Sequence, residues 1–288
     1  MPPADGRFLQ GLALCVAAAV AWSVIGPLSR ACFAAGMTPA ELTFWRLAVS
    51  GACFIAHAGL RGELRASPRE LAWFSAYGTA VVALGLYASQ LSIALSGGAI
   101  AIILMFTAPP WVALFSRILF KERLTAAKLS AMALAMAGTV CVCWSGGSMQ
   151  AEVSYLGLAC GLLSGFLYAM QFPLVVYFKE RFSTAALFAF TFTPAALVLA
   201  PFVGEFHLNA VSTGCMLVLA LVSSYLAYLL YGLSLHWITP VQAAVIGNLE
   251  PVAGALLCWW FWDENFSAVG WAGCALVIGS VMILAARR

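Results

Sequence analysis

The sequence predicts an all-α integral membrane protein of ten transmembrane helices, arranged as two inverted five-helix repeats around a central cavity. Three observations predict this fold class: an apolar composition, a series of long apolar segments, and an internal repeat. Of the 288 residues, 64% are apolar and 9% are charged, and the mean hydropathy is +0.98. An ordinary soluble domain has about 25% charged residues, so this composition excludes a soluble globular protein. The 14 basic residues are also too scattered for a nucleic-acid interface.

The apolar segments are long enough to cross a membrane as helices. Dividing the chain at charges and at Gly, Pro or Asn breaks gives ten spans of roughly 20 residues, the length needed for a hydrocarbon core of about 30 Å. We expect them at Phe8–Ser29, Glu41–Leu60, Leu71–Leu95, Ala99–Leu119, Thr125–Trp144, Ser154–Phe178, Thr184–Gly204, Thr213–His236, Pro240–Trp262 and Phe266–Ala286. The first is too long for a signal peptide, so we expect an uncleaved helix. The short connections leave no room for a folded domain outside the membrane.

The basic residues predict the orientation. Basic loops of membrane proteins face the cytoplasm. With a cytoplasmic N-terminus, most basic residues fall at cytoplasmic ends: Arg7, Arg61, Arg65, Arg69, Lys121, Arg123, Lys128, Lys179, Arg181, Arg287 and Arg288. The acidic residues of the outer loops are Glu152, Glu205, Asp263 and Glu264. We therefore expect an inner-membrane protein with both termini in the cytoplasm.

The chain contains an internal repeat. A shift of 142 residues places Leu91–Thr139 on Leu233–Val281 without a gap (from 91 to 233). The first spans of the two copies match at a shift of 146 residues, which places Trp22 on Tyr168 (from 22 to 168). The equivalent pairs include Pro109 and Pro251, Glu122 and Glu264, Trp22 and Tyr168, and Pro27 and Pro173. We expect one repeat in residues 1–146 and the second in residues 147–288.

The two repeats are predicted to be inverted. Each holds five spans, and an odd number gives the halves opposite orientations in the membrane. The loop charges agree, because Lys121-Glu122-Arg123 is basic whereas the equivalent Asp263-Glu264-Asn265 is acidic. Inverted repeats are typical of secondary transporters, whose two similar halves open a shared site to either side in turn.

Two segments resemble a known family signature. They are Pro109…Phe120-Lys121-Glu122-Arg123-Leu124…Gly138 and its echo Leu249-Glu250-Pro251…Asp263-Glu264…Gly279, with Trp22, Tyr168 and Phe44-Trp45-Arg46 also in keeping. The chain is similar to the EamA family of the drug/metabolite transporter superfamily, and most similar to YddG-type aromatic amino-acid exporters. The resemblance implies a basket-like bundle around a substrate cavity and the export of amino acids or other metabolites. One feature departs from the repeated pattern: the second copy has Asp263-Glu264-Asn265 where the first copy has the basic Lys121-Glu122-Arg123.

Prolines within the spans mark candidate hinges. A proline inside a helix removes a backbone hydrogen bond, and the freed carbonyl must face protein or water within a membrane. The candidates form two repeat-related pairs: Pro27 with Pro173, and Pro109 with Pro251. We expect their four helices to surround the transport pathway. The alternative is that these prolines only shape helix packing.

Aromatic and amide side chains are the candidate substrate-binding residues. They are Trp22, Tyr87, Gln90, Tyr168, Gln171, Tyr228, Asn248 and Glu250. Amides offer a zwitterion both donors and acceptors without a fixed charge, and aromatic rings suit a bulky, mostly apolar solute. The alternative for the rings is an interfacial aromatic belt.

Two charged residues within spans leave alternatives open. Inserting a helix with a carboxylate at the membrane centre costs roughly 2.5–3.5 kcal/mol of free energy on insertion scales. Glu250 is therefore structural, in contact with the solute, or involved in proton coupling. Arg46 is either its long-range counter-charge or extends to the membrane interface.

These features favour a secondary transporter that exports aromatic or large neutral amino acids by alternating access. The alternatives are a passive channel or facilitator, and an intramembrane hydrolase, for which Ser164 has no histidine in a credible span. The partners are a small-molecule solute and membrane lipid, and we expect a monomer that binds no nucleic acid. We expect no enzyme activity, no cofactor and no metal, because His57, His207 and His236 are dispersed near span ends.

Overall fold

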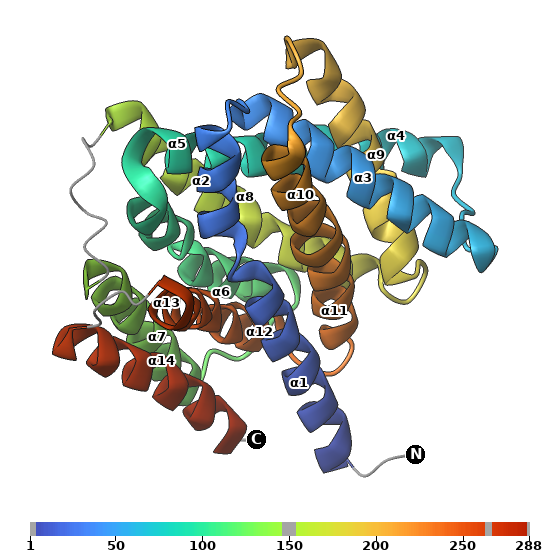
Figure 1. Cartoon of the computed structure of the whole chain (residues 1–288). Helices are drawn as coiled ribbons and strands as arrows, with labels where there is room; N and C mark the ends of the chain where they lie inside the picture. Colours follow the sequence, from blue (N-terminus) through green and yellow to red (C-terminus); the bar gives the residue numbers. More distant parts are fainter. Residues whose placement is uncertain (1–3, 146–153, 263–266, 287–288) are drawn as a thin grey trace.

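The computed structural model describes residues 4–145, 154–262 and 267–286 and shows a bundle of helices (Figure 1). Side chains of residues 4, 5, 145, 258–262 and 286 are not described. The α-helices are α1 (Ala4–Trp22), α2 (Ile25–Ala34), α3 (Pro39–Leu60), α4 (Pro68–Tyr77), α5 (Leu84–Met105), α6 (Ala108–Leu119), α7 (Ala126–Ser145), α8 (Tyr155–Phe178), α9 (Thr184–Leu199), α10 (Ala210–Val218), α11 (Ala227–Ser234), α12 (Pro240–Gly247), α13 (Leu249–Trp262) and α14 (Ala268–Ala286). Two π-helical segments, η1 (Gly78–Ala83) and η4 (Leu219–Leu226), and a 3-10 turn, η3 (Ala200–Phe202), continue neighbouring helices.

Polar residues at the loop ends determine where several helices begin. Thr38, Ser67 and Thr239 each precede a proline, and each side chain accepts a hydrogen bond from a backbone N–H of the first turn. This arrangement satisfies a donor that would otherwise lack an intrahelical partner, and proline at the first helical position has no N–H to satisfy. The local sequence alone therefore fixes the starts of α3, α4 and α12.

The helices support a multi-pass membrane protein. Within the described parts of the chain, eight helices are long and apolar enough to span a membrane. Of the ten predicted spans, Glu41–Leu60 and Pro240–Trp262 are not among these eight. The first coincides with α3 and the second with α12 and α13, so the count of ten stays a prediction. Large apolar side chains lie on the outside, as lipid contact requires; examples are Leu197, Ile118 and Met282, each at least 65% exposed.

The packing of the helices repeats between the two halves. Helix α3 packs against its equivalent α9, and α7 packs against its equivalent α14. In the first half α5 lies against α8, which begins the second half; correspondingly, α11 of the second half lies against α1, which begins the first. If the first and second halves are exchanged, each of these helix contacts is therefore replaced by a contact between the equivalent helices. This pseudo-symmetry fits the predicted two-repeat architecture.

The π-helical segments extend the repeat beyond the residues that match in sequence. A shift of 142 residues carries η1 from 78–83 to 220–225, which lies within η4. Gly78 begins η1 at a very close approach to α9, because a Cβ atom at this position would collide with the carbonyl of Thr191. Such π-segments occur frequently at functional sites, and Ser224 of η4 hydrogen-bonds Arg46, which lines the cavity described below.

Three helices are interrupted next to prolines that were predicted to be hinges. The interruptions lie at Ser23–Val24, at Phe106–Thr107 and at Asn248. At the latter two, a tight hydrogen bond closes the preceding turn, from Thr107 N to Leu104 O and from Asn248 N to Val245 O, each 3.1 Å. A new helix then begins, so Pro27, Pro109 and Pro251 occupy a first turn, where the missing N–H has no intrahelical role. Pro173 differs, because α8 continues through it without interruption.

Candidate functional site

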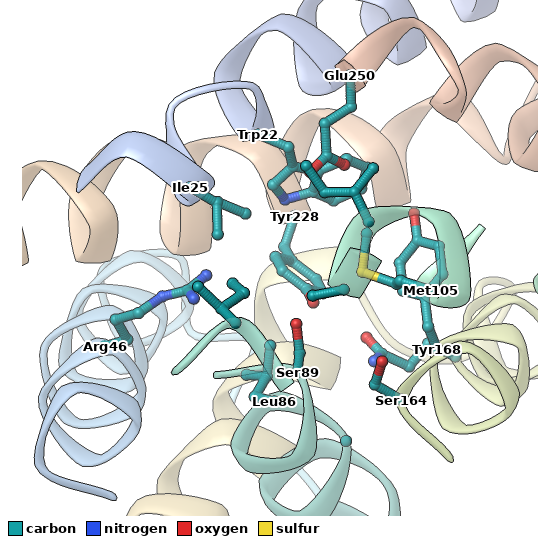
Figure 2. Close-up of a pocket in the computed structure, with 16 residues that line it drawn as sticks. Trp22, Ile25, Arg46, Leu86, Ser89, Met105, Ser164, Tyr168, Tyr228 and Glu250 are labelled. Carbon is teal, nitrogen blue, oxygen red and sulfur yellow. The ribbon is translucent and has the colours of Figure 1, made fainter. Parts of the chain in front are cut away.

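A cavity of about 50 Å³ lies where the two halves meet (Figure 2). Helices α1, α2, α3 and α5 line it from the first half, and α8, α11 and α13 line it from the second. Its walls are formed by Trp22, Ile25, Gly26, Arg46, Gly85, Leu86, Ser89, Ile93, Ala101, Ile102, Met105, Ser164, Tyr168, Gln171, Tyr228 and Glu250. Ligand-binding cavities of membrane transporters are commonly found at such repeat interfaces.

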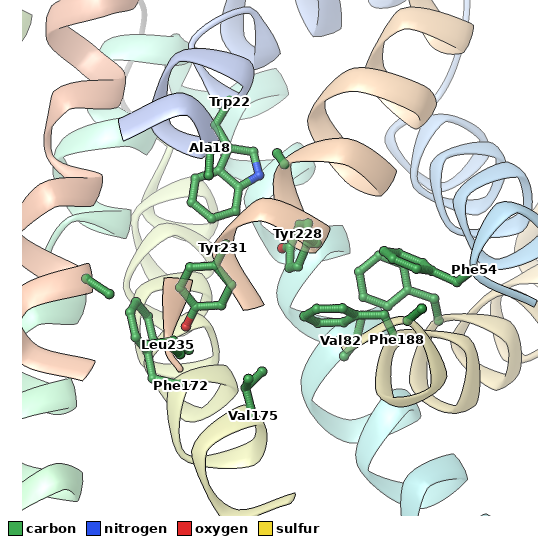
Figure 3. Close-up of a cluster of buried hydrophobic side chains, with 14 of the residues drawn as sticks. Ala18, Trp22, Phe54, Val82, Phe172, Val175, Phe188, Tyr228, Tyr231 and Leu235 are labelled. Atoms are coloured by element: carbon green, nitrogen blue, oxygen red, sulfur yellow. The ribbon is translucent and has the colours of Figure 1, made fainter. Parts of the chain in front are cut away.

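Aromatic rings form one wall of the cavity. Trp22, at the end of α1, makes edge-on ring contacts with Tyr168 (centroids 6.1 Å apart) and Tyr228 (5.4 Å). The ring contacts continue through Tyr231 to Phe172 (Figure 3), and neither of these two residues lines the cavity. All of these rings are in contact with several neighbours, so the wall is held by its own packing rather than by one residue.

A buried arginine faces the cavity from α3. Arg46 is 2% exposed, and its Nε donates a hydrogen bond to Ser224 Oγ in η4 at 3.1 Å. Its Nη2 atom has no hydrogen-bond partner among the residues that the structure describes. Because the side chain is buried, it does not extend to the membrane interface, which excludes that alternative for this conformation.

Glu250 faces the same cavity from α13. It lies in the first turn of this helix, after the interruption at Asn248, and is 6% exposed. The partial positive charge of a helix N-terminus stabilises a carboxylate at this position. Figure 2 shows Arg46 and Glu250 entering the cavity from different sides. In the described parts of the chain, no ion pair within 4.0 Å joins the two residues.

Three further polar side chains line the cavity: Ser89, Ser164 and Gln171. Gln171, one turn after Tyr168 on α8, lies beside the Tyr228 hydroxyl. The Gln171 Oε1 atom is buried without a hydrogen-bond partner in the described structure. The Ser164 hydroxyl instead donates to the carbonyl of Gly161 in its own helix, at 2.7 Å. The cavity therefore combines aromatic walls with one amide, one carboxyl and one guanidinium group.

The structure brings five of the eight predicted binding residues into this cavity: Trp22, Tyr168, Gln171, Tyr228 and Glu250. Tyr87 is partly buried and Gln90 fully buried, but neither lines the cavity. Asn248 also lies outside it, because its amide accepts a hydrogen bond from Thr139 Oγ1 at 3.0 Å and donates one to Ala244 O at 3.0 Å. Solute contact by these three residues stays a prediction.

Arg46 is a charged cavity residue that the sequence prediction did not include among the binding residues. An ionisable residue within a membrane span is by itself a signal of a functional site. The sequence showed this signal but left two directions open for the side chain. The direction was decided by η4, because Ser224 holds the Arg46 guanidinium on the cavity side of α3.

The cavity in this conformation is too small for a metabolite. Its volume of about 50 Å³ accommodates one or two waters at about 30 Å³ each. Pockets for small-molecule ligands typically measure about 300–1,000 Å³. A solute larger than a few atoms therefore requires the surrounding helices to move apart.

Comparisons with known proteins agree with this architecture. The model of the EamA-like transporter family matches residues 9–144 and again residues 155–286. A crystal structure described only as "Crystal structure of protein" is similar, with a TM-score of 0.80 and 20% sequence identity over 96% of this chain and 98% of that chain. At this identity the likeness concerns the fold alone. A search of curated proteins found no match.

Proposed function

Because the chain belongs to the EamA-like transporter family, we propose that it is a secondary transporter that exports aromatic or large neutral amino acids by alternating access. Members of this family are transporters rather than enzymes, and the apolar helices indicate a multi-pass protein in a lipid environment. The proposal adds the solute class, the direction and the mechanism. It also assigns the repeats to residues 1–146 and 147–288.

The observation that carries the solute class is the cavity lining. Trp22 and Tyr228 provide apolar faces for a large side chain, while Gln171 and Glu250 provide polar groups for its backbone end. A few polar groups in an otherwise apolar and aromatic cavity are typical of sites for bulky, mostly apolar ligands. The pair Trp22 and Tyr168 supplies one ring from each half, so both halves contact the same solute.

Alternating access is supported by the small cavity and the interrupted helices. The cavity must expand to admit an amino acid, and the interruptions beside Pro27, Pro109 and Pro251 provide places where the helices can bend. Pro173 is proposed as the fourth hinge from its equivalence to Pro27. A passive channel is the second candidate function, and it requires a continuous opening from one side of the membrane to the other.

We further propose that the protein resides in an inner membrane with both termini in the cytoplasm. The basic residues support this orientation through the positive-inside rule. The acidic Asp263-Glu264-Asn265 segment, on which the inverted orientation of the second half partly depends, lies outside the described residues.

The function is tested by counterflow in proteoliposomes. Purified protein is reconstituted into vesicles loaded with unlabelled L-phenylalanine, and uptake of labelled L-phenylalanine is followed with and without a proton gradient. A carrier shows saturable accumulation that depends on the internal solute, whereas a channel shows no such stimulation. The absence of exchange over a broad amino-acid panel would refute the solute class, and the effect of the gradient would show whether protons drive transport.

A further inference from the structure

Two buried ionisable side chains face one cavity without sufficient partners. Arg46 and Glu250 are 2% and 6% exposed. Buried charged groups in proteins are normally paired and hydrogen-bonded, because burial removes their hydration and an unpaired charge regains nothing in return. A side chain that lacks partners within the protein and points into a cavity is therefore expected to find them in a ligand.

The protein meets only part of the hydrogen-bonding capacity of Arg46. A guanidinium carries five N–H donors in a planar fork and has no acceptor. One of these donors, Nε–H, is bonded to Ser224, and Nη2 has no partner in the described structure. The fork geometry matches a carboxylate, which accepts two parallel hydrogen bonds. The free part of the guanidinium thus suits a carboxylate ligand.

Glu250 provides the complementary group. Among the hydrogen bonds found in residues 4–145, 154–262 and 267–286, none involves its carboxyl oxygens. Arg46 and Glu250 interact electrostatically, but at a longer distance than an ion pair. Both side chains line the same cavity, so a solute admitted when this cavity expands can separate the two groups and contact both. An ammonium group is the natural partner of a carboxylate in such a site.

We propose that Arg46 binds the α-carboxylate and Glu250 binds the α-ammonium group of a zwitterionic amino acid, so that both solute charges are required for transport. This inference rests on the proposed function and names the residues that recognise the solute. Trp22 and Tyr228 lie beside these two groups in the cavity and contact the solute side chain.

The arrangement predicts strong selection against solutes that carry only one of the two charges. An amine without a carboxylate leaves Arg46 unpaired, and an acid without an ammonium leaves Glu250 unpaired. A binding site built for a polar group rejects the analogue that lacks it, since its own buried group then stays unsatisfied. The side chain of the solute is selected less strictly, because apolar contacts discriminate weakly.

The first experiment uses the unmodified protein. Counterflow of labelled L-phenylalanine is measured in the presence of L-leucine, phenethylamine or 3-phenylpropionate. We expect L-leucine to compete, and each single-charge analogue to inhibit at least about tenfold more weakly than unlabelled L-phenylalanine, as the loss of one charged hydrogen-bonding group predicts. Equal inhibition by either analogue would overturn the inference.

The second experiment changes the arginine. Arg46→Gln is expected to raise the KM for L-phenylalanine by about tenfold to a hundredfold, with a smaller increase for Arg46→Lys. Arg46→Gln is also expected to reduce the preference for L-phenylalanine over phenethylamine, which general loss of structure would not do. Arg117→Gln is the matched control, because Arg117 is exposed and lies outside the cavity lining. An unchanged KM and an unchanged preference in Arg46→Gln would contradict the inference.

The two proposals fail in different ways. If the unmodified protein exchanges no amino acid, the proposed function is wrong. If it exchanges amino acids but accepts single-charge analogues equally well, the function stands and the roles assigned to Arg46 and Glu250 are wrong. The competition experiment decides this even if Arg46→Gln does not fold, because it requires no variant.

Discussion

The rings of Trp22 and Tyr168 meet edge to face, with their centroids 6.1 Å apart and their planes at 83°. The two residues occupy equivalent positions of the two halves, 146 residues apart (22 and 168). Edge-to-face contact is a favoured arrangement for aromatic pairs. The pair therefore joins the halves at their shared cavity, and motion of one half relative to the other must change this contact.

Replacement of Trp22 by alanine is expected to destabilise the protein. It removes ring contacts with Tyr168, Tyr228 and Tyr231, and aromatic pairs contribute about 0.5–1.5 kcal/mol each. We expect the free energy of unfolding to fall by about 2 kcal/mol or more. The measurement is thermal unfolding in detergent, followed by counterflow. The matched control is Trp144→Ala, because Trp144 is 64% exposed. Equal destabilisation by both substitutions would contradict the assigned packing role.

The contact between α7 and α14 predicts opposite effects for two glycines of the same helix. A Cβ atom at Gly273 would lie 2.7 Å from the Gly138 carbonyl oxygen, whereas one at Gly279 would meet nothing within 4 Å. Gly273→Ala is expected to cost about 1–3 kcal/mol through overpacking. Gly279→Ala is expected to be neutral or to stabilise by up to about 1 kcal/mol through helix propensity. Melting temperatures of the two variants test this, and similar values would show that α7 and α14 do not pack this closely.

The hydrogen bond between Thr139 and Asn248 predicts an energetic coupling. It links α7 to the interruption between α12 and α13, and both side chains are almost fully buried. In a double-mutant cycle with Thr139→Val and Asn248→Ala, we expect a coupling of about 0.6 kcal/mol and at most about 1.7 kcal/mol, the range found between membrane helices. Thermal unfolding of the four proteins gives this energy.

Ser280→Ala is the control for this cycle, because among the described residues the buried Ser280 hydroxyl bonds only within its own helix, to the carbonyl of Val277. It is expected to show no coupling to Thr139→Val. Additivity of Thr139→Val and Asn248→Ala would mean that the bond contributes nothing measurable.

The inverted orientation of the halves predicts opposite labelling of two equivalent positions. Lys121 and Asp263 are 142 residues apart (121 and 263). In a background without native cysteines, Lys121→Cys is expected to react with a membrane-impermeant reagent from the cytoplasmic side. Asp263→Cys is expected to react from the opposite side. Reaction of both from one side would remove the inverted-repeat model and, with it, the main support for alternating access.

Much of the fold was predictable because helix positions follow from local composition. The span predicted at Ser154–Phe178 corresponds to α8 at Tyr155–Phe178, and the one at Thr125–Trp144 corresponds to α7 at Ala126–Ser145. A helix in lipid must satisfy its own backbone groups, so a long apolar segment has few alternatives to a helix. The interruption at Asn248 was not predicted, since a proline indicates a bend but not the residue at which the helix ends.

The site was predictable only in part, because a helix repeats every 3.6 residues and the sequence does not show which face its neighbours cover. Gln171 and Asn248 looked alike as amides in apolar spans. In the structure, Gln171 faces the cavity, whereas Asn248 is engaged by Thr139. The partner of Asn248 comes from a helix that is more than 100 residues away in the chain, so the local sequence does not show it.

By itself the sequence determined a membrane-embedded helical chain with a twofold repeat, because apolar length and repeated spacing are local properties. Tertiary structure alone decided that Trp22 meets Tyr168 and that Arg46 and Glu250 face one cavity. The reason is that these contacts depend on how helices from both halves pack together, and Arg46 in particular is directed by a serine 178 positions away.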